Sequence, residues 1–332
     1  MTYRVNQSQL GVAIGKNSES ESPQNGDSAL FYPAINNIFG SQQKLRFMMK
    51  SQSLIIATLT LVAIIFEGPL SAQERWQRGQ NIQPVFEGWE RNTDGSFNMV
   101  FGYLNRNYEE QPVIPVGPNN LFEPGPPDQN QPTHFYNRRQ QFVFSVRVPA
   151  DWDPEQDLTW SVTHNGRTDH AYGHLWPVWE IDGGVRRLNR GTGTAQGFTD
   201  NQRPSIRVEG NLEHFEVSLP NSLEIVVVAG DDGIPPPNPR LASRNPRRGP
   251  KSQAIVDPRK AAATGLAVTW LHWRGPGTVT FSPQVPEIGE GGRAVTQVRF
   301  SEPGTYQLQA IADDTVYVTP TTVTVTVKSS QP

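Results

Sequence analysis

Residues 158–171 read LTWSVTHNGRTDHA, and this stretch decides the fold class of the chain. Apolar side chains first stand at every second position, which is the pattern of a strand with one buried face. Asn165-Gly166 follows, a dipeptide that strongly favours a two-residue turn between antiparallel strands. The stretch therefore predicts a β-hairpin in which Trp160 faces Ala171, and it makes an all-β fold the first expectation.

Segments on the N-terminal side of the hairpin extend this interpretation. Residues 97–103 and 142–148 also alternate between apolar and polar side chains, so each predicts a strand. Residues 112–132 are rich in proline, which cannot donate a hydrogen bond inside a sheet, so they predict a loop or an edge strand. A polar, glycine-rich stretch at 183–203 predicts a linker. Residues 73–182 are thus expected to form a β-sandwich-like domain.

The C-terminal side, residues 204–328, repeats the pattern more regularly. Seven short segments of strand character are separated by turn residues, at 205–209, 223–229, 266–273, 278–281, 294–300, 306–310 and 323–327. This series predicts an immunoglobulin-like (Ig-like) sandwich. A long loop at 231–264, rich in proline and arginine, interrupts the series after the second strand.

A resemblance supports the C-terminal assignment. The sequence SEPGTY at 301–306, before an alternating strand that ends in ADD at 312–314, resembles the end of PKD and related bacterial Ig-like domains. The resemblance implies a β-sandwich module of an exported protein, used for binding or spacing. The WDFGDG signature of PKD domains is replaced by WLHWRG at 270–275, which favours the broader Ig-like class. Residues 88–107 are similar to uncharacterised exported bacterial proteins, and this similarity implies no activity.

Composition limits the classes of function. The chain has 332 residues, no cysteine and a formal net charge of −3. Disulfides and thiol catalysis are therefore excluded, and the fold must be stabilised by packing alone. The near-neutral charge argues against a nucleic-acid-binding protein. The Gly-x-Ser-x-Gly motif of serine hydrolases is missing, and no motif identifies a cofactor.

An uncharged run of thirteen residues, LIIATLTLVAIIF at 54–66, indicates where the protein acts. A helix that spans a bilayer needs about 20 apolar residues, whereas thirteen suits the centre of a secretory signal. Residues 48–72 therefore predict a signal peptide cleaved after Ala72, and an exported protein in the periplasm or outside the cell. The alternative is an uncleaved anchor in the inner membrane, the chain's only expected membrane contact. Residues 1–47 are expected to be a disordered extension or to precede the true start.

Acidic loops raise calcium as a candidate cofactor. In an Ig-like sandwich the loops after the second, fourth and sixth strands gather at one end. Here those loops carry six carboxylates: Asp231, Asp232, Glu287, Glu290, Asp313 and Asp314. Ca²⁺ takes six to eight hard oxygen ligands, so the cluster could supply several of them. The alternative is that acidic residues simply solvate the ends of these loops.

Tryptophans raise carbohydrate as a candidate ligand. An exposed indole ring offers an apolar face on which a sugar can stack, although most aromatic side chains serve the core. The candidates are Trp152, Trp176 and Trp179, whereas Trp160 and Trp270 fall on core faces. Seven basic residues in the 231–264 loop add a second expectation, an anionic partner such as a cell-surface polysaccharide or lipid headgroups. An envelope protein is the other partner considered.

These observations favour a non-catalytic binding or structural protein of the cell envelope or exterior, without identifying its ligand. A polysaccharide-active enzyme with its site in the N-terminal domain is the alternative from a different class. A deep cleft there, with two carboxylates about 5–10 Å apart, would favour the enzyme. Exposed tryptophans on a flat face would favour a carbohydrate-binding protein. A pure spacer module would show neither feature.

Overall fold

A computed structural model describes residues 76–182, 184–185, 200–238 and 255–329. The expected extension at 1–47, the signal peptide at 48–72, most of the linker and residues 239–254 of the arginine-rich loop lie outside these ranges. The described part is all-β, as the sequence predicts. None of the helices within those ranges is long and apolar enough to cross a membrane.

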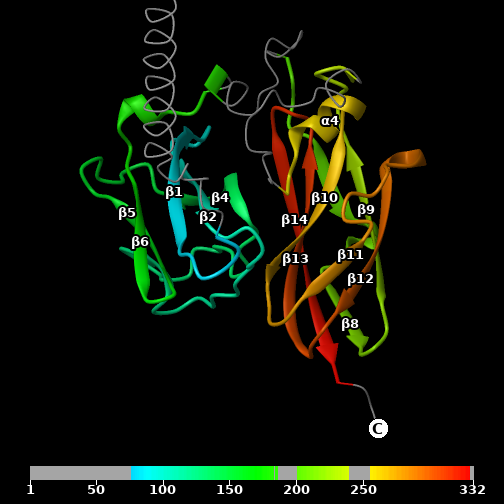
Figure 1. Ribbon diagram of the computed structural model, residues 1–332. Helices are drawn as coiled ribbons and strands as arrows, with labels where there is room; N and C mark the ends of the chain where they lie inside the picture. The colour runs from blue at the N-terminus through cyan, green and yellow to red at the C-terminus, as the bar shows by residue number, and fades with distance from the viewer. Residues whose placement is uncertain (1–75, 183, 186–199, 239–254, 330–332) are drawn as a thin grey trace, which may run out of the picture. The chain divides into compact units, whose positions relative to one another are not determined.

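The N-terminal sandwich consists of two three-stranded sheets (Figure 1). One has the order β1-β2-β4, formed by β1 (Ile82–Arg91), β2 (Phe97–Asn105) and β4 (Arg138–Val148). The other has the order β3-β5-β6, formed by β3 (Asn120–Glu123), β5 (Leu158–His164) and β6 (Arg167–Gly173). All four strand pairings are antiparallel. The proline-rich stretch supplies β3 as an edge strand, with loops on both sides.

The β5–β6 hairpin has the predicted register, with Trp160 opposite Ala171. Asn165 and Gly166 have φ angles of 51° and 72°. Positive φ at both central positions is typical of a type I′ turn, whose twist matches the twist of the flanking strands. Asn and Gly are the residues that best tolerate this region. The local sequence therefore sets the register of the whole hairpin.

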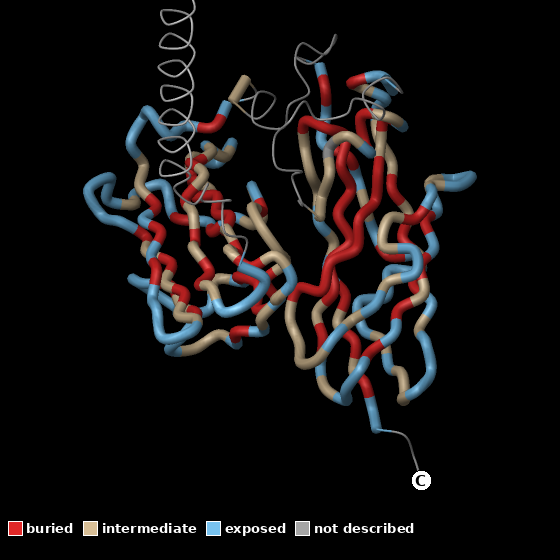
Figure 2. The backbone as a smooth tube through the Cα atoms, in the orientation of Figure 1, coloured by how far each residue is buried: buried red, intermediate tan, exposed pale blue. Residues whose placement is uncertain are grey.

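Aromatic rings fill the core of the N-terminal sandwich, where the strands show buried segments (Figure 2). Trp160 is fully buried and stacks on Phe122, with 5.8 Å between ring centroids. The buried Asn120 accepts a hydrogen bond from Trp160 Nε1 at 2.9 Å. Its amide nitrogen donates to the carbonyls of Ile114 and Pro132 at 3.0 and 2.9 Å. A polar network thus supports the aromatic packing.

Strand β4 departs from the simple alternation that the sequence shows. Residues 141–143 bulge opposite Gly102 of β2. Phe142 lies in this bulge with a φ of 51° and is half-buried, whereas the alternation of residues 142–148 predicts Phe142 on the core face with Phe144, Val146 and Val148. The Glu87 carboxylate occupies the space beside Gly102, where a Cβ would come within 2.2 Å of it. Arg139 holds that carboxylate with hydrogen bonds of 2.7 and 2.8 Å, which fixes the bulge.

The C-terminal sandwich has two four-stranded sheets, with the orders β10-β13-β14-β8 and β11-β12-β9-β7 (Figure 1). The first contains β8 (His214–Ser218), β10 (Ala267–Arg274), β13 (Gly304–Asp313) and β14 (Val318–Lys328). The second contains β7 (Ser205–Val208), β9 (Leu223–Gly230), β11 (Val279–Ser282) and β12 (Arg293–Phe300). Mostly aliphatic side chains fill the core, together with Trp270 and Tyr306. This is the Ig-like sandwich expected for residues 204–328.

The structure adds elements that the sequence pattern did not reveal. An eighth strand, β8, pairs in parallel with β14; its residues are exposed or half-buried, so their alternation is weak. Helix α4 (Pro258–Thr264) ends the stretch expected to be a loop at 231–264, which corrects that expectation. Asp257 caps α4 by accepting a hydrogen bond from the Arg259 backbone N–H at 3.0 Å. Short 3₁₀ turns are η1 (Pro177–Trp179), η2 (Glu209–Asn211) and η3 (Glu290–Gly292).

Candidate functional site

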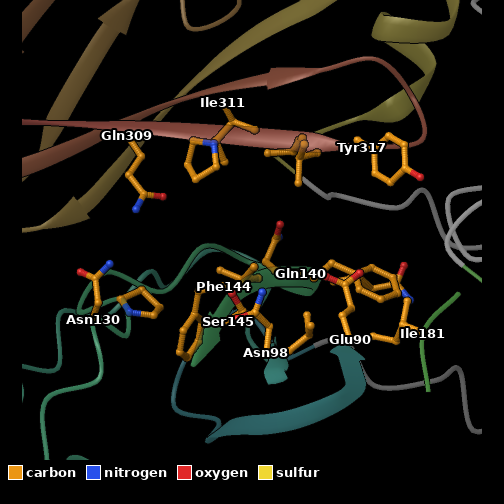
Figure 3. A pocket seen from close by; sticks show the side chains of 18 of the residues that line it. Glu90, Asn98, Asn130, Gln140, Phe144, Ser145, Ile181, Gln309, Ile311 and Tyr317 are labelled. Carbon is orange, nitrogen blue, oxygen red and sulfur yellow. The ribbon is translucent and has the colours of Figure 1, made fainter. Parts of the chain in front are cut away.

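A cleft of about 1270 Å³ lies within the described part of the chain. Its lining comes from β2 and β4 of the N-terminal sandwich and from β10 and β13 of the C-terminal sandwich. Figure 3 shows Gln309 and Ile311 on one side, with Asn98, Phe144 and Ser145 on the other. Pockets for small ligands commonly measure roughly 300–1,000 Å³. The cleft is thus large enough for more than one small molecule or for part of a polymer.

Side-chain amides give the cleft uncharged hydrogen-bonding groups. Gln309 is buried, and its Oε1 has no hydrogen-bond partner. The amides of Asn98 and Asn92 bind each other reciprocally at 3.0 and 3.1 Å, which fixes their orientation. Gln140 Oε1 accepts the backbone N–H of Ile255 at 3.1 Å. Polar groups in fixed positions beside apolar surface are suited to binding a neutral, hydroxylated ligand.

Two stacked histidines, His134 and His272, also line the cleft, with ring centroids 4.5 Å apart. Burial lowers the pKa of His134 to about 3, and the neighbouring His272 contributes to this shift. Burial likewise lowers the pKa of His272 to about 4. Its backbone N–H donates to the Tyr136 hydroxyl at 2.7 Å. Both rings are therefore neutral near pH 7 and are suited to packing, whereas a general base would need a pKa near the working pH.

The enzyme alternative requires two carboxyl groups whose surroundings separate their pKa values. Asp94 lines the cleft, and hydrogen bonds from Ser96 lower the pKa of its carboxyl. Burial raises the pKa of Glu87, but Arg139 binds both of its carboxylate oxygens, and Glu87 is not part of the cleft lining. Neither carboxyl has the protonated, accessible form that a general acid needs.

An exposed aromatic pair, Trp176 and Trp179, forms what we call the tryptophan platform. The two residues are 52% and 42% exposed; Trp176 directly precedes η1 and Trp179 is its last residue. Both rings contact His174, at centroid distances of 4.5 and 5.8 Å. Trp89 Nε1 donates to the carbonyl of Trp176 at 2.9 Å, so the turn is anchored to β1 while both rings stay accessible.

The third tryptophan candidate, Trp152, has a different environment. It is half-buried and packs against the N-terminal core. Its Nε1 donates to the carbonyl of Gln156 at 3.0 Å. These contacts give Trp152 a role in holding its own loop.

The acidic loops of the C-terminal sandwich are partly brought together. Burial, and to a smaller extent the charge of Asp231, raise the pKa of Asp314 to about 6. These two carboxylates are therefore neighbours, with Asp232 beside Asp231. Throughout the described ranges, no three His, Cys, Asp or Glu side chains group as a metal site would require. The site formed by all six acidic residues, with Glu287, Glu290 and Asp313 included, stays a prediction.

Sequence reasoning missed the cleft because its residues look like solvent-facing members of strands. In β13 the alternation places Tyr306 and Leu308 in the core, which assigns Gln309 and Ile311 to the outer face. Both outer residues are nevertheless buried, at 4% and 6% exposure. An isoleucine on a face assigned to solvent was the one signal in the strand that pointed to a covered surface.

The comparisons with known proteins identify no family. No family model matches the chain, and no curated protein matches it. The PKD domain of human KIAA0319 is 14% identical over 42% of this chain and 93% of that domain, with a TM-score of 0.22. Fibronectin(III)-like modules of CbhA from Clostridium thermocellum are 12% identical over 75% and 95%, with a TM-score of 0.20. Domains 4 and 5 of the S-layer protein SbsC are 12% identical over 57% and 70%, with a TM-score of 0.23.

These neighbours are PKD, fibronectin III and S-layer sandwich domains, the class already given by the strand order. Because the TM-scores are low, the classification of the C-terminal sandwich as Ig-like rests on its own strand order and register. The same topology is common to structural and binding modules.

Proposed function

We propose that this chain is an exported, non-catalytic binding module whose tryptophan platform binds carbohydrate. The observation that carries the proposal is that Trp176 and Trp179 expose their rings while their backbone is held firmly. Contiguous exposed apolar surface is often a binding site. Export is supported by the apolar run at 54–66, and polysaccharides are abundant ligands outside the cytoplasm.

The platform is preorganised by its attachment to β1. The backbone N–H of Trp179 donates to the carbonyl of Trp176 at 2.9 Å, and Ile181 donates to the carbonyl of Trp89 at 2.8 Å. Gly88 allows this close approach, because a Cβ there would lie 2.4 Å from the carbonyl oxygen of Trp179. A rigid platform loses little conformational entropy on binding, so more of the stacking energy appears as affinity.

The chemistry around the rings suits a sugar. A pyranose ring has an apolar C–H face that stacks on indole and a rim of hydroxyl groups that needs hydrogen-bonding partners. The buried Nε2 of His174, between the two tryptophans, has no partner of its own. Tyr172 is 52% exposed and adds a hydroxyl-bearing ring to the described surface.

The residues that directly follow the tryptophan platform in the sequence line the cleft. Glu180, Ile181 and Asp182 follow Trp179 directly, and all three line the cleft. The uncharged amides of the cleft provide further hydrogen bonds for a longer ligand. This arrangement supports an oligosaccharide or polysaccharide segment over a single monosaccharide.

A glycan array with the full chain, followed by calorimetry on the best ligand, tests the proposal. Trp176→Ala and Trp179→Ala are expected to weaken binding at least about tenfold each, which corresponds to about 1.4 kcal/mol. Leu212→Ala is the matched control, because Leu212 is 54% exposed on the C-terminal half and lies outside the platform. The intact mass of the protein recovered from the cell exterior shows at the same time whether it begins at Gln73.

Other outcomes decide between the rival functions. Unchanged affinity in both tryptophan variants would place the glycan site elsewhere and overturn the platform. Binding of no glycan would leave the spacer as the remaining function. Release of new reducing ends from a bound polysaccharide would establish the enzyme instead.

A further inference from the structure

Two carboxylates at one end of the C-terminal sandwich, those of the buried Asp314 and the half-buried Asp231, each keep an oxygen atom without a partner. Asp314 has no exposed surface; its Oδ1 accepts the backbone N–H groups of Val316 and Tyr317 at 2.7 and 2.6 Å, but its Oδ2 makes no hydrogen bond. Asp231 Oδ2 accepts the N–H of Gly233 at 2.9 Å, while its Oδ1 is buried and unpartnered. Neither carboxylate forms an ion pair with a described lysine or arginine.

A third side chain, the amide of Asn201, points to a missing ligand independently of these charges. Asn201 is 9% exposed, and neither its Oδ1 nor its Nδ2 has a hydrogen-bond partner. Its amide faces the Asp314 carboxylate as a hydrogen-bond donor and so lowers the pKa of that group, but the contact falls short of full hydrogen-bond geometry. Buried amides are nearly always hydrogen-bonded, so an amide with both ends unsatisfied needs an explanation.

We propose that Asn201, Asp231 and Asp314 hold a calcium ion through their three unpartnered side-chain oxygens. Carboxylate and amide oxygens are the hard ligands that Ca²⁺ prefers, and backbone carbonyls with water complete its shell of six to eight. This site is narrower than the six-carboxylate cluster expected from the sequence, and it includes an asparagine that the sequence did not suggest. The proposal is independent of carbohydrate binding.

The charge balance of the site supports a cation. Burial and the neighbouring like charge both disfavour the ionised form of Asp314, and burial and Asp232 do the same for Asp231. A cation between the two carboxylates would remove this penalty. Neighbouring carboxylates add to the negative potential but are already engaged: Asp232 accepts the backbone N–H of Gln202 at 2.8 Å and that of Ile234 at 2.9 Å.

Binding would join three segments that are far apart in the sequence. Asn201 precedes β7, Asp231 follows β9, and Asp314 follows β13. Asn201 lies near the end of the expected 183–203 linker, just before β7. The ion would therefore fix the point at which the chain enters the C-terminal sandwich. With only two carboxylates, the affinity should fall in the weak extracellular range of roughly 10⁻⁴–10⁻³ M.

Calorimetric titration of the full chain with CaCl₂, together with thermal melts in CaCl₂ and in chelator, tests the site. We expect one ion per chain, a dissociation constant in the range above and a higher melting temperature with Ca²⁺, because the ion binds only the folded state. Asp314→Asn and Asp231→Asn should each weaken binding at least about tenfold. Both should fold, since each removes one of two neighbouring like charges, and in chelator they should melt no lower than the wild type.

A second variant and a matched control separate the site from general charge effects. Asn201→Ala removes an oxygen ligand without changing the charge, and it should weaken Ca²⁺ binding while the melting temperature in chelator is unchanged. Glu287→Gln with Glu290→Gln removes two acidic charges from loops of the same sandwich and should leave the affinity unchanged. Absence of binding at millimolar Ca²⁺, or equal affinity in the wild type and both aspartate variants, would overturn the proposal.

Discussion

The N-terminal sandwich buries aromatic rings together with side-chain amides, whereas the C-terminal sandwich buries mainly valine and alanine. The buried amides of the N-terminal sandwich include Asn105, Asn107 and Asn120, which are fully buried and hydrogen-bonded. In the C-terminal core, the buried Thr296 makes a single hydrogen bond, to the carbonyl of Pro283 at 2.6 Å.

The difference follows from the size of the sheets. Three-stranded sheets leave more loop backbone to cover the core, and the buried carbonyls of those loops require donors. Asn120 provides two of them, for Ile114 and Pro132. Four-stranded sheets satisfy more of their backbone groups within the ladders, so aliphatic packing suffices. The N-terminal sandwich therefore depends on a few polar residues to a degree that the C-terminal one does not.

The sharpest test of this contrast compares Asn120→Leu with Thr296→Val. Asn120→Leu leaves the Trp160 indole N–H and two carbonyls without partners, and each buried unsatisfied group costs about 1–3 kcal/mol. We expect a loss of at least about 3 kcal/mol in unfolding free energy, against about 1 kcal/mol for Thr296→Val, measured by denaturant unfolding. Equal losses would show that the polar network does not distinguish the two cores.

A smaller effect is expected from exchanging the two central tryptophans for phenylalanine. Trp160→Phe breaks the hydrogen bond to Asn120 Oδ1, whereas Trp270 Nε1 has no partner to lose. Both variants lose similar ring volume, so Trp160→Phe should be the more destabilising by about 1–3 kcal/mol. Thermal melts of the two variants measure this difference. In a double-mutant cycle with Asn120→Leu, the Trp160→Phe loss should shrink, and strict additivity would contradict the network.

The alternation of apolar and polar residues predicted the strands and their buried faces wherever this two-residue period alone determines them. The register of the β5–β6 hairpin and the core positions of Trp160 and Trp270 are confirmed. Strand β8 and the bulge at Phe142 were not foreseeable, since β8 buries little and the bulge depends on Glu87 and Arg139, which are 52 residues apart. The platform could be proposed from the sequence, but the cleft could not, because its two walls belong to distant strands.

The smallest expected effect is the pH dependence of folding stability, which should have opposite signs in the two sandwiches. The pKa of Asp314 is raised from 3.8 to about 6 by burial first and by Asp231 next. Between these two pH values the folded state holds a proton that the unfolded state has released, so stability without Ca²⁺ should fall as pH rises from about 4 to about 6. The size is limited because the N–H groups of Val316 and Tyr317 already stabilise the carboxylate.

Asp94 of the N-terminal sandwich should contribute with the opposite sign. Hydrogen bonds from Ser96 lower its pKa, so its contribution is present above 3.8 and is lost as pH falls below that value. Melting temperatures measured across this pH range in chelator, for the wild type and Asp314→Asn, isolate the C-terminal contribution. The variant should lose the decline between pH 4 and 6, and added Ca²⁺ should reduce it in the wild type. A decline that persists in Asp314→Asn would assign the pH dependence to another carboxyl group.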